Sequence, residues 1–207
     1  MTTSADTPTA AATDLPAAPP GLPLPRKQLL LVGTGAFDVI HLPYWALTLR
    51  VKFGWDVRVC LTASADALVS RRAIAAASRN PVSGPDWDTE RGLVPHQELA
   101  QWADLVVVLP ATTSFIGKCA AGIPDSLALT VVLNSPAPVV IGPSIPEVAL
   151  SRPAVRRNLR TLEEDGFHVV PRRSGISVHA GAAADGWSCS LGAALTTAAK
   201  ALASPGH

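Results

Sequence analysis

Short stretches that are apolar at almost every position, separated by segments with a helical pattern, restrict the fold of this chain most strongly. Residues 28–32 (QLLLV), 56–61 (DVRVCL), 104–109 (DLVVVL) and 139–142 (VVIG) are of this kind. A strand that is apolar on both sides has to be buried on both faces, as in a parallel sheet with helices on each side. The sequence therefore predicts a single-domain, doubly wound α/β fold of the Rossmann-like or flavodoxin-like type.

The segments between these strands supply the predicted helices and loops. A short final strand is expected at 168–170, whereas 127–133 fits helix and strand equally well. Helices are expected at 39–50, 64–77, 96–102, 112–121, 145–165 and 188–202, with loop at 78–95 and irregular structure at 171–187.

The first 25 residues differ in composition from the rest of the chain. They consist mainly of Thr, Ala and Pro without periodicity, so we expect residues 1–25 to be a disordered tail and residues 26–205 to form the domain. They also lack the basic start and the continuous apolar stretch of a signal peptide.

Charge and cysteine content exclude several classes of function. The formal net charge of +1 provides no basic surface for nucleic acid or an anionic membrane, and the apolar runs are too short to cross a bilayer. Three cysteines at unrelated spacings form neither a disulfide framework nor a metal site. We therefore expect a cytoplasmic protein without metal, nucleic acid or membrane partners.

Small and hydroxyl side chains follow the first two predicted strands. Gly33, Thr34, Gly35 and Ala36 come between a strand and a helix, where small residues let backbone N–H groups approach a phosphate; a plain tight turn is the alternative. Thr62 and Ser64 follow the second strand, either as ligands at the same edge or as caps of the next helix.

The third strand leads into a second group of polar residues. Pro110, Ala111, Thr112, Thr113 and Ser114 join it to a helix, and one hydroxyl should cap that helix. Asp125 and Ser126, followed by Leu127, come after another turn that can return to the same edge. His96 precedes this strand; it is either a surface or capping residue or a group that accepts and returns a proton.

The segment 107–130 (VVLPATTSFIGKCAAGIPDSLALT) resembles the region around the Pro-Ala-Ser-Ala-Asn-Thr motif of the flavin-containing cysteine decarboxylases. GTGAFDVI at 33–40 resembles that family's turn around the flavin phosphate, and His96 falls where the family has its active-site histidine. The resemblance covers about residues 28–203, and the pattern is most similar to the epidermin-type peptidyl-cysteine decarboxylases of ribosomal peptide biosynthesis.

The resemblance implies FMN as cofactor and His96 as the acid and base beside the substrate thiol. It also implies that 171–187 forms a substrate clamp whose Arg172 and Arg173 hold a peptide carboxylate; two solvated arginines on a hairpin are the alternative. The implied FMN contacts are Gly33, Thr34, Gly35, Ala36, Thr62, Ser64, Pro110, Ala111, Thr112, Thr113, Ser114, Asp125, Ser126 and Leu127, and the implied substrate contacts are Ser144, Pro146, Arg172 and Arg173.

The resemblance further implies an oxidative decarboxylation. The C-terminal cysteine of a ribosomally made precursor peptide would lose carbon dioxide and two hydrogens to give an enethiol, on the way to an aminovinyl-cysteine ring. The enzyme would be a homo-oligomer, a trimer or a dodecamer of trimers, with the flavin between subunits.

Two departures from the family pattern keep other functions open. Ser114 and Phe115 replace the Asn-Thr that ends the motif, and Pro146 stands where the family has a catalytic Asn. The alternatives are a non-catalytic flavin-binding subunit and a phosphopantothenoylcysteine decarboxylase. Against the latter, Cys189 lies in GWSCSLG without the Gly-Asp that follows the cysteine in that branch.

Overall fold

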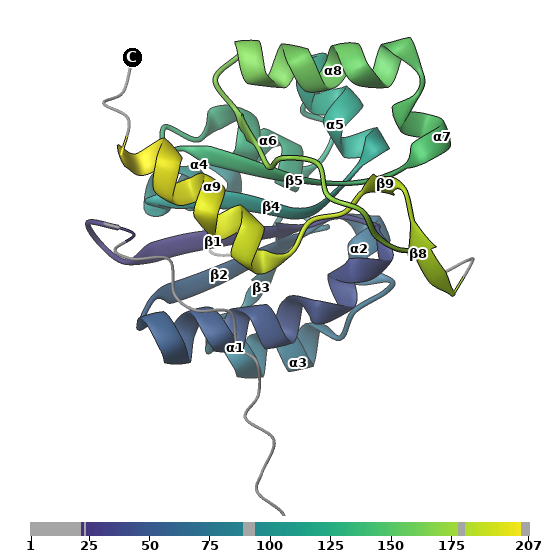
Figure 1. The fold of residues 1–207 in the computed structure, drawn as a ribbon. Helices are drawn as coiled ribbons and strands as arrows, with labels where there is room; N and C mark the ends of the chain where they lie inside the picture. Colours follow the sequence, from purple (N-terminus) through teal and green to yellow (C-terminus); the bar gives the residue numbers. More distant parts are fainter. Residues whose placement is uncertain (1–21, 23, 89–93, 178–180, 204–207) are drawn as a thin grey trace, which may run out of the picture.

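The computed structural model describes residues 22, 24–88, 94–177 and 181–203. Their centre is a mostly parallel sheet in the order β3-β2-β1-β4-β5-β6, with β9 antiparallel beside the end of β5 (Figure 1). The strands are β1 (Gln28–Gly33), β2 (Asp56–Leu61), β3 (Val82–Ser83), β4 (Leu105–Thr112), β5 (Val139–Pro146), β6 (His168–Val169) and β9 (Gly186–Trp187). The predicted doubly wound α/β fold is confirmed.

Helices cover both faces of the sheet, which explains why the central strands are apolar throughout. Along β1, Leu29 and Leu31 belong to the core on one face and Leu30 and Val32 to the core on the other. The first core is closed by α1 (Leu42–Phe53), α3 (Arg71–Ser78) and α9 (Leu191–Ala203), and the second by α4 (Pro95–Trp102), α5 (Thr113–Ala120), α6 (Leu127–Asn134) and α8 (Pro153–Glu164).

Several element boundaries differ from the sequence-based expectation. The helix expected from residue 39 begins at Leu42, because a 3-10 turn, η1 (Phe37–His41), precedes α1 and Pro43 lies in the first turn of α1. The helix expected at 64–77 is two helices, because Ser70 caps α3 anew after the short α2 (Ala63–Asp66). The ambiguous segment 127–133 is helical, and β3 lies inside the expected loop 78–95.

The expectations for the second half need the largest corrections. β5 runs on to Pro146, so the helix expected from 145 begins only at α7 (Glu147–Leu150). The segment 171–187 is not irregular: it contains a hairpin of β7 (Gly175–Ser177) with β8 (Ala182–Ala184), followed by β9. The pairing of β5 with β9 joins segments about 40 residues apart, and local periodicity in the sequence does not reveal such a pairing.

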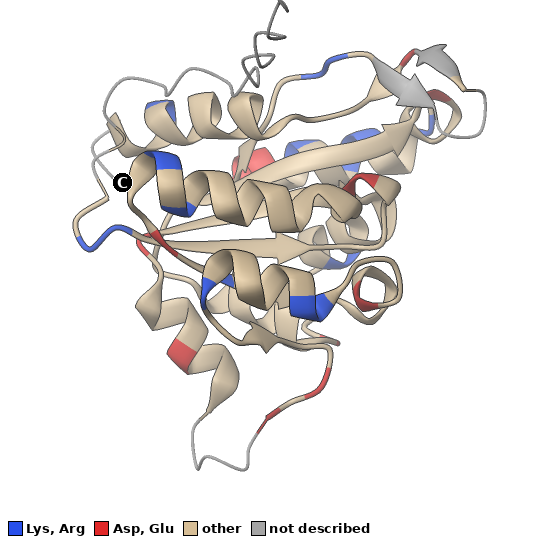
Figure 2. Ribbon diagram, turned by 90° about the horizontal axis from the view of Figure 1, so that it is seen from below, with Lys and Arg blue, Asp and Glu red and all other residues tan. Residues whose placement is uncertain are grey.

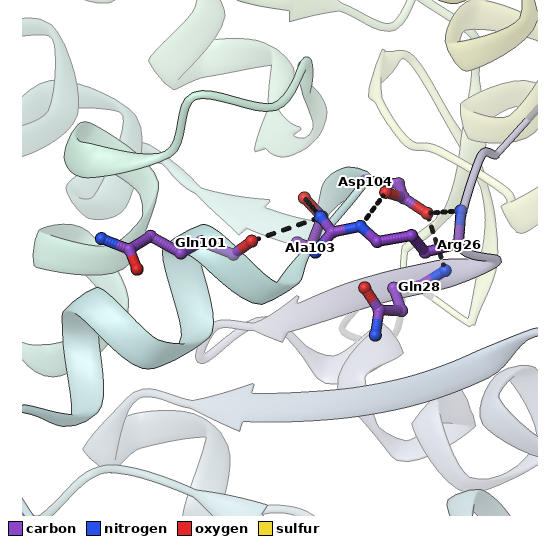
Figure 3. Close-up of polar contacts among 5 residues, drawn as sticks. All are labelled: Arg26, Gln28, Gln101, Ala103 and Asp104. Atoms are coloured by element: carbon purple, nitrogen blue, oxygen red, sulfur yellow. Dashed lines mark hydrogen bonds and ion pairs between the residues drawn. The ribbon is translucent and has the colours of Figure 1, made fainter. Parts of the chain in front are cut away.

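The start of the chain is tied to the domain. Most of the expected tail, residues 1–21 and 23, lies outside the described residues, but Leu24 is buried against the first core. Two residues later, the Arg26 backbone N–H and Nε donate to the carboxylate of Asp104, at 2.7 and 2.9 Å, and the Gln28 N–H donates at 3.1 Å (Figure 3). These bonds join the beginning of β1 to the residue just before β4.

Charged residues of both signs are scattered over helices and loops in the view of Figure 2, among a larger number of uncharged positions. None of the described helices is long and apolar enough to cross a membrane.

Candidate functional site

A cavity of about 380 Å³ lies where β1, β2 and β4 end. Since β1 is flanked by β2 and β4 and all three are parallel, their carboxyl ends meet at one edge, where doubly wound sheets bind ligands. The cavity is lined by Thr34, Gly35, Thr62, Ala63, Ser64, Thr112, Ser114, Phe115, Lys118, Asp125, Ser126 and Leu129. We call this cavity the cradle.

Two glycines at the end of β1, Gly33 and Gly35, allow the backbone of this turn to pack closely against its neighbours. A Cβ at Gly35 would lie 2.4 Å from the Cβ of Ser64, and a Cβ at Gly33 would lie 2.6 Å from a methyl of Leu42. Neither position can hold a larger residue unless its surroundings move. The turn 33–36 therefore needs its small residues for packing, and these leave the backbone open to a ligand.

Thr34 fixes the relative position of two strand ends. Its side chain is 1% exposed; its hydroxyl donates to the Pro110 carbonyl at 2.7 Å and accepts from the Thr112 N–H at 2.9 Å. Both capacities of this hydroxyl are thus used within the protein. Thr34 shapes the wall of the cradle, and its side chain has no bond left for a phosphate.

Three hydroxyl residues of the cradle cap helices that begin at its rim. Thr62 accepts from the Ala65 N–H in α2, Thr112 from the Phe115 N–H in α5, and Ser126 from the Leu129 N–H in α6. The alternative role of Thr62 as a cap is therefore confirmed, and Thr112 is the hydroxyl that caps α5. Starts of helices carry partial positive charge, so the rim favours an anionic group.

Lys118 and Asp125 form an ion pair in the wall of the cradle. Nζ of Lys118 lies 2.6 Å from Oδ2 of Asp125, and the two side chains are 43% and 44% exposed. Lys118 is on α5, one turn after Ser114, and Asp125 precedes α6. Among the described residues lining the cradle they are the single cation and the single anion.

Eight of the fourteen cofactor residues expected from sequence line the cradle: Thr34, Gly35, Thr62, Ser64, Thr112, Ser114, Asp125 and Ser126. Another five lie next to these residues in the chain but do not line the cradle: Gly33, Ala36, Pro110, Ala111 and Thr113. Leu127 lines a different cavity. Sequence reasoning did not assign Ala63, Phe115, Lys118 and Leu129. Helical spacing points to two of these, since Lys118 follows Ser114 by four residues and Leu129 follows Ser126 by three.

His96 lies in the first turn of α4 and does not line the cradle. Its ring meets the ring of Trp87 edge-on, with centroids 5.4 Å apart. Nδ1 is buried and has no hydrogen-bond partner. The preceding Pro95 lines a second cavity of about 390 Å³, together with Arg58, Arg71, Glu98 and Leu127 among others.

The expected substrate residues lie at the end of β5 and beside it. Ser144 pairs with Thr112 of the cradle, and Pro146 pairs with Gly186 of β9. Nε of Arg172 donates to the Gly186 carbonyl at 3.0 Å, so this guanidinium is partly used in holding the segment together. None of the four expected substrate residues lines the cradle, and Arg173 is exposed nearby in sequence.

The three cysteines are structural residues. Burial raises the pKa of each thiol, Cys60, Cys119 and Cys189, to about 12. A Cβ at Gly142 would lie 3.0 Å from Sγ of Cys189, which places that thiol in the first core. No group of three potential metal ligands occurs among the described residues.

Comparison with known proteins agrees with this geometry. The model of the Flavoprotein family matches residues 19–188. The chain belongs to this family. The FMN-dependent cysteine decarboxylase SpaF has a solved structure that is 34% identical, covers 85% of the flavoprotein chain and 97% of SpaF, and superposes with a TM-score of 0.71.

Two further relatives of this flavoprotein are named for different biosynthetic pathways. The FMN-dependent cysteine decarboxylase TvaF from thioviridamide biosynthesis is 28% identical over 83% of the chain and 98% of TvaF, with a TM-score of 0.68. The coenzyme A biosynthesis bifunctional protein CoaBC of Bacillus subtilis is 37% identical over 146 residues, which are 70% of this chain and 36% of that protein. The flavoprotein thus spans about a third of the length of this curated relative.

The predicted resemblance and the flavin cofactor are confirmed by family membership, and FMN is the flavin on which SpaF and TvaF depend. The cradle fits such a group. Hydroxyls and helix starts form its rim, and its volume lies in the usual range of cofactor sites. Gly35, Ser64 and Ser114 are the residues best placed to hold FMN.

Proposed function

We propose that this flavoprotein is an FMN-dependent decarboxylase acting on the C-terminal cysteine of a peptide. The observation that carries the proposal is the cradle at the ends of β1, β2 and β4, in a chain that covers 97% of SpaF at 34% identity. SpaF and TvaF are both named as FMN-dependent cysteine decarboxylases, which supports cysteine as the group that reacts.

The proposed reaction removes carbon dioxide and two hydrogens from the terminal cysteine. FMN held in the cradle would supply the acceptor for one hydride from Cβ, and the thiol proton would be released. The Cα–carboxylate bond then breaks, and its electron pair passes to the C=S group left by the oxidation. A proton completes the enethiol at the end of the peptide.

The protein contributes orientation and proton transfer. His96 takes the thiol proton at Nε2, because Nδ1 is buried. Arg173 and the end of β5 hold the substrate carboxylate, since Pro146 has no side-chain amide. His96 does not line the cradle of its own chain, so we include in the proposal a homo-oligomer, trimeric or dodecameric, in which a neighbouring chain completes the site.

The first test is the visible absorption spectrum of the purified protein, followed by mass spectrometry of the released chromophore. A yellow protein that releases FMN is expected. Without air, a peptide ending in Cys should bleach one flavin per peptide and lose carbon dioxide plus two hydrogens, whereas the same peptide ending in Ser should do neither. A colourless protein that takes up no FMN contradicts the proposal.

A second candidate substrate is phosphopantothenoylcysteine, favoured by the 37% identity to CoaBC. In this chain Cys189 is buried in the first core, so its thiol is not presented at the clamp segment. The same anaerobic assay separates the candidates: bleaching by phosphopantothenoylcysteine but not by the peptide would favour this second substrate.

A further inference from the structure

The Lys118–Asp125 pair stands out from the other polar groups of the cradle. Thr34, Thr62, Thr112 and Ser126 each accept a backbone N–H bond that holds a strand end or a helix start in place, and they are uncharged. Lys118 and Asp125 instead bond only to each other among the described residues, and both side chains are more than two-fifths exposed. This pair can therefore be exchanged without undoing the fold.

FMN brings a negative charge into this space. Its phosphate is the one ionised group of the oxidised cofactor, and the rim of helix starts and hydroxyls favours an anion. The carboxylate of Asp125 repels a phosphate, whereas the ammonium of Lys118 attracts it. An ammonium on a flexible four-carbon stem can turn from one anion to another over a short distance.

We propose that Lys118 is the counter-ion of the FMN phosphate, and that its bond to Asp125 is exchanged for the phosphate when FMN binds. Asp125 then holds Lys118 in the wall of the cradle before binding and competes with the cofactor for it. This inference rests on FMN as the ligand of the cradle but not on the peptide substrate or on decarboxylation.

Comparison of FMN with riboflavin tests the inference, because riboflavin lacks the phosphate. Binding is measured by quenching of flavin fluorescence on the flavin-stripped full chain. Lys118→Met should weaken FMN binding by roughly 10-fold, the usual contribution of a charge-assisted bond, and leave riboflavin binding unchanged. Asp125→Asn should strengthen FMN binding and again leave riboflavin unchanged.

Lys27→Met serves as the matched control. It removes the same charge from an exposed residue at the opposite end of β1, about 20 Å from the cradle for a six-residue strand. FMN affinity should be unchanged in this variant.

Other results overturn the inference. Equal loss of FMN and riboflavin in Lys118→Met would make Lys118 a flavin-ring or structural residue. A loss of FMN affinity in Asp125→Asn as large as that in Lys118→Met would show that the intact ion pair is what binding requires. Failure of the unmodified chain to bind FMN would instead refute the proposed function, so the two failures are distinguishable.

Discussion

The hydroxyl of Thr34 accepts a hydrogen bond from the backbone N–H of Thr112 at 2.9 Å. The two residues are 78 positions apart in the chain, and the bond joins the end of β1 to the end of β4. The same hydroxyl donates to the Pro110 carbonyl. One buried side chain therefore sets the spacing of two walls of the cradle.

Replacing this hydroxyl should destabilise the fold and distort the cradle. Thr34→Val keeps the shape but leaves a buried N–H and a buried carbonyl unpaired, at a cost of about 1–3 kcal/mol in the free energy of unfolding. Urea denaturation measures this change in the free energy of unfolding. Thr34→Ser should recover most of the loss, and Thr196→Val, at an exposed position of α9, should change stability little. Equal midpoints for Thr34→Val and the unmodified protein would contradict this role.

Gly35→Ala should reduce flavin binding through a steric conflict. The new Cβ would lie 2.4 Å from the Cβ of Ser64, so the turn 33–36 or the start of α2 has to move. Such overpacking costs about 1–3 kcal/mol. The double variant Gly35→Ala with Ser64→Gly removes the opposing atom and should regain part of the free energy of unfolding, but not the FMN affinity, because the Ser64 hydroxyl is lost as well.

Gly117→Ala is the matched control for this substitution. In α5 its Cβ would meet only the amide end of Asn158, at 3.2 Å, and alanine favours a helix over glycine. If Gly35→Ala binds FMN as well as Gly117→Ala does, close packing at the turn is not needed for the cofactor.

Asp104 should make stability depend on acid pH. Burial raises the pKa of its carboxyl, but the hydrogen bonds from Gln28 and Arg26 outweigh burial and hold the pKa below its usual value. The stabilisation is therefore full above the pKa of the unfolded chain, about 4, and is lost as the pH falls through the lower pKa of the folded state.

Asp104→Asn should accordingly lower the free energy of unfolding by about 1–3 kcal/mol at pH 7. The difference from the unmodified protein should shrink as the pH falls below about 4, because the unfolded chain then binds a proton that the folded carboxylate does not, and it should vanish once the folded carboxyl is protonated as well. Asp86→Asn, at an exposed position, is the control and should change little. A difference that stays constant from pH 7 to pH 3 would show that the charge of Asp104 contributes nothing.

The sequence was sufficient to predict the sheet and the location of the cradle, because both depend on local patterns. Apolar runs identify buried strands, and the residues directly after β1, β2 and β4 have to meet at one edge. Lys118 and Leu129 were missed since they lie inside helices rather than in the loops after strands. Their helical spacing from Ser114 and Ser126 was the available signal.

The hairpin of β7 with β8 and the pairing of β9 with β5 could not be predicted in the same way. β7, β8 and β9 have only two or three residues each, too few for a periodic pattern, and β9 also depends on a distant partner, since Trp187 pairs with Ile145 about 40 positions earlier. The hydrogen bond from the Thr34 hydroxyl to the Pro110 carbonyl could not be predicted either. A threonine in a glycine-rich turn has the same local sequence pattern whether its hydroxyl binds a ligand or a neighbouring strand.

The role of His96 gives the sharpest prediction for catalysis. His96→Asn should keep FMN, since His96 does not line the cradle, and lower peptide turnover by at least about 100-fold through loss of proton transfer. Trp87→Ala removes the ring that meets His96 edge-on at 5.4 Å and should lower kcat more than it raises KM, while Trp87→Phe retains a ring and most of the rate. FMN content and single-turnover bleaching by a Cys-ending peptide measure both effects. Full turnover in His96→Asn with bound FMN would show that another group takes the thiol proton.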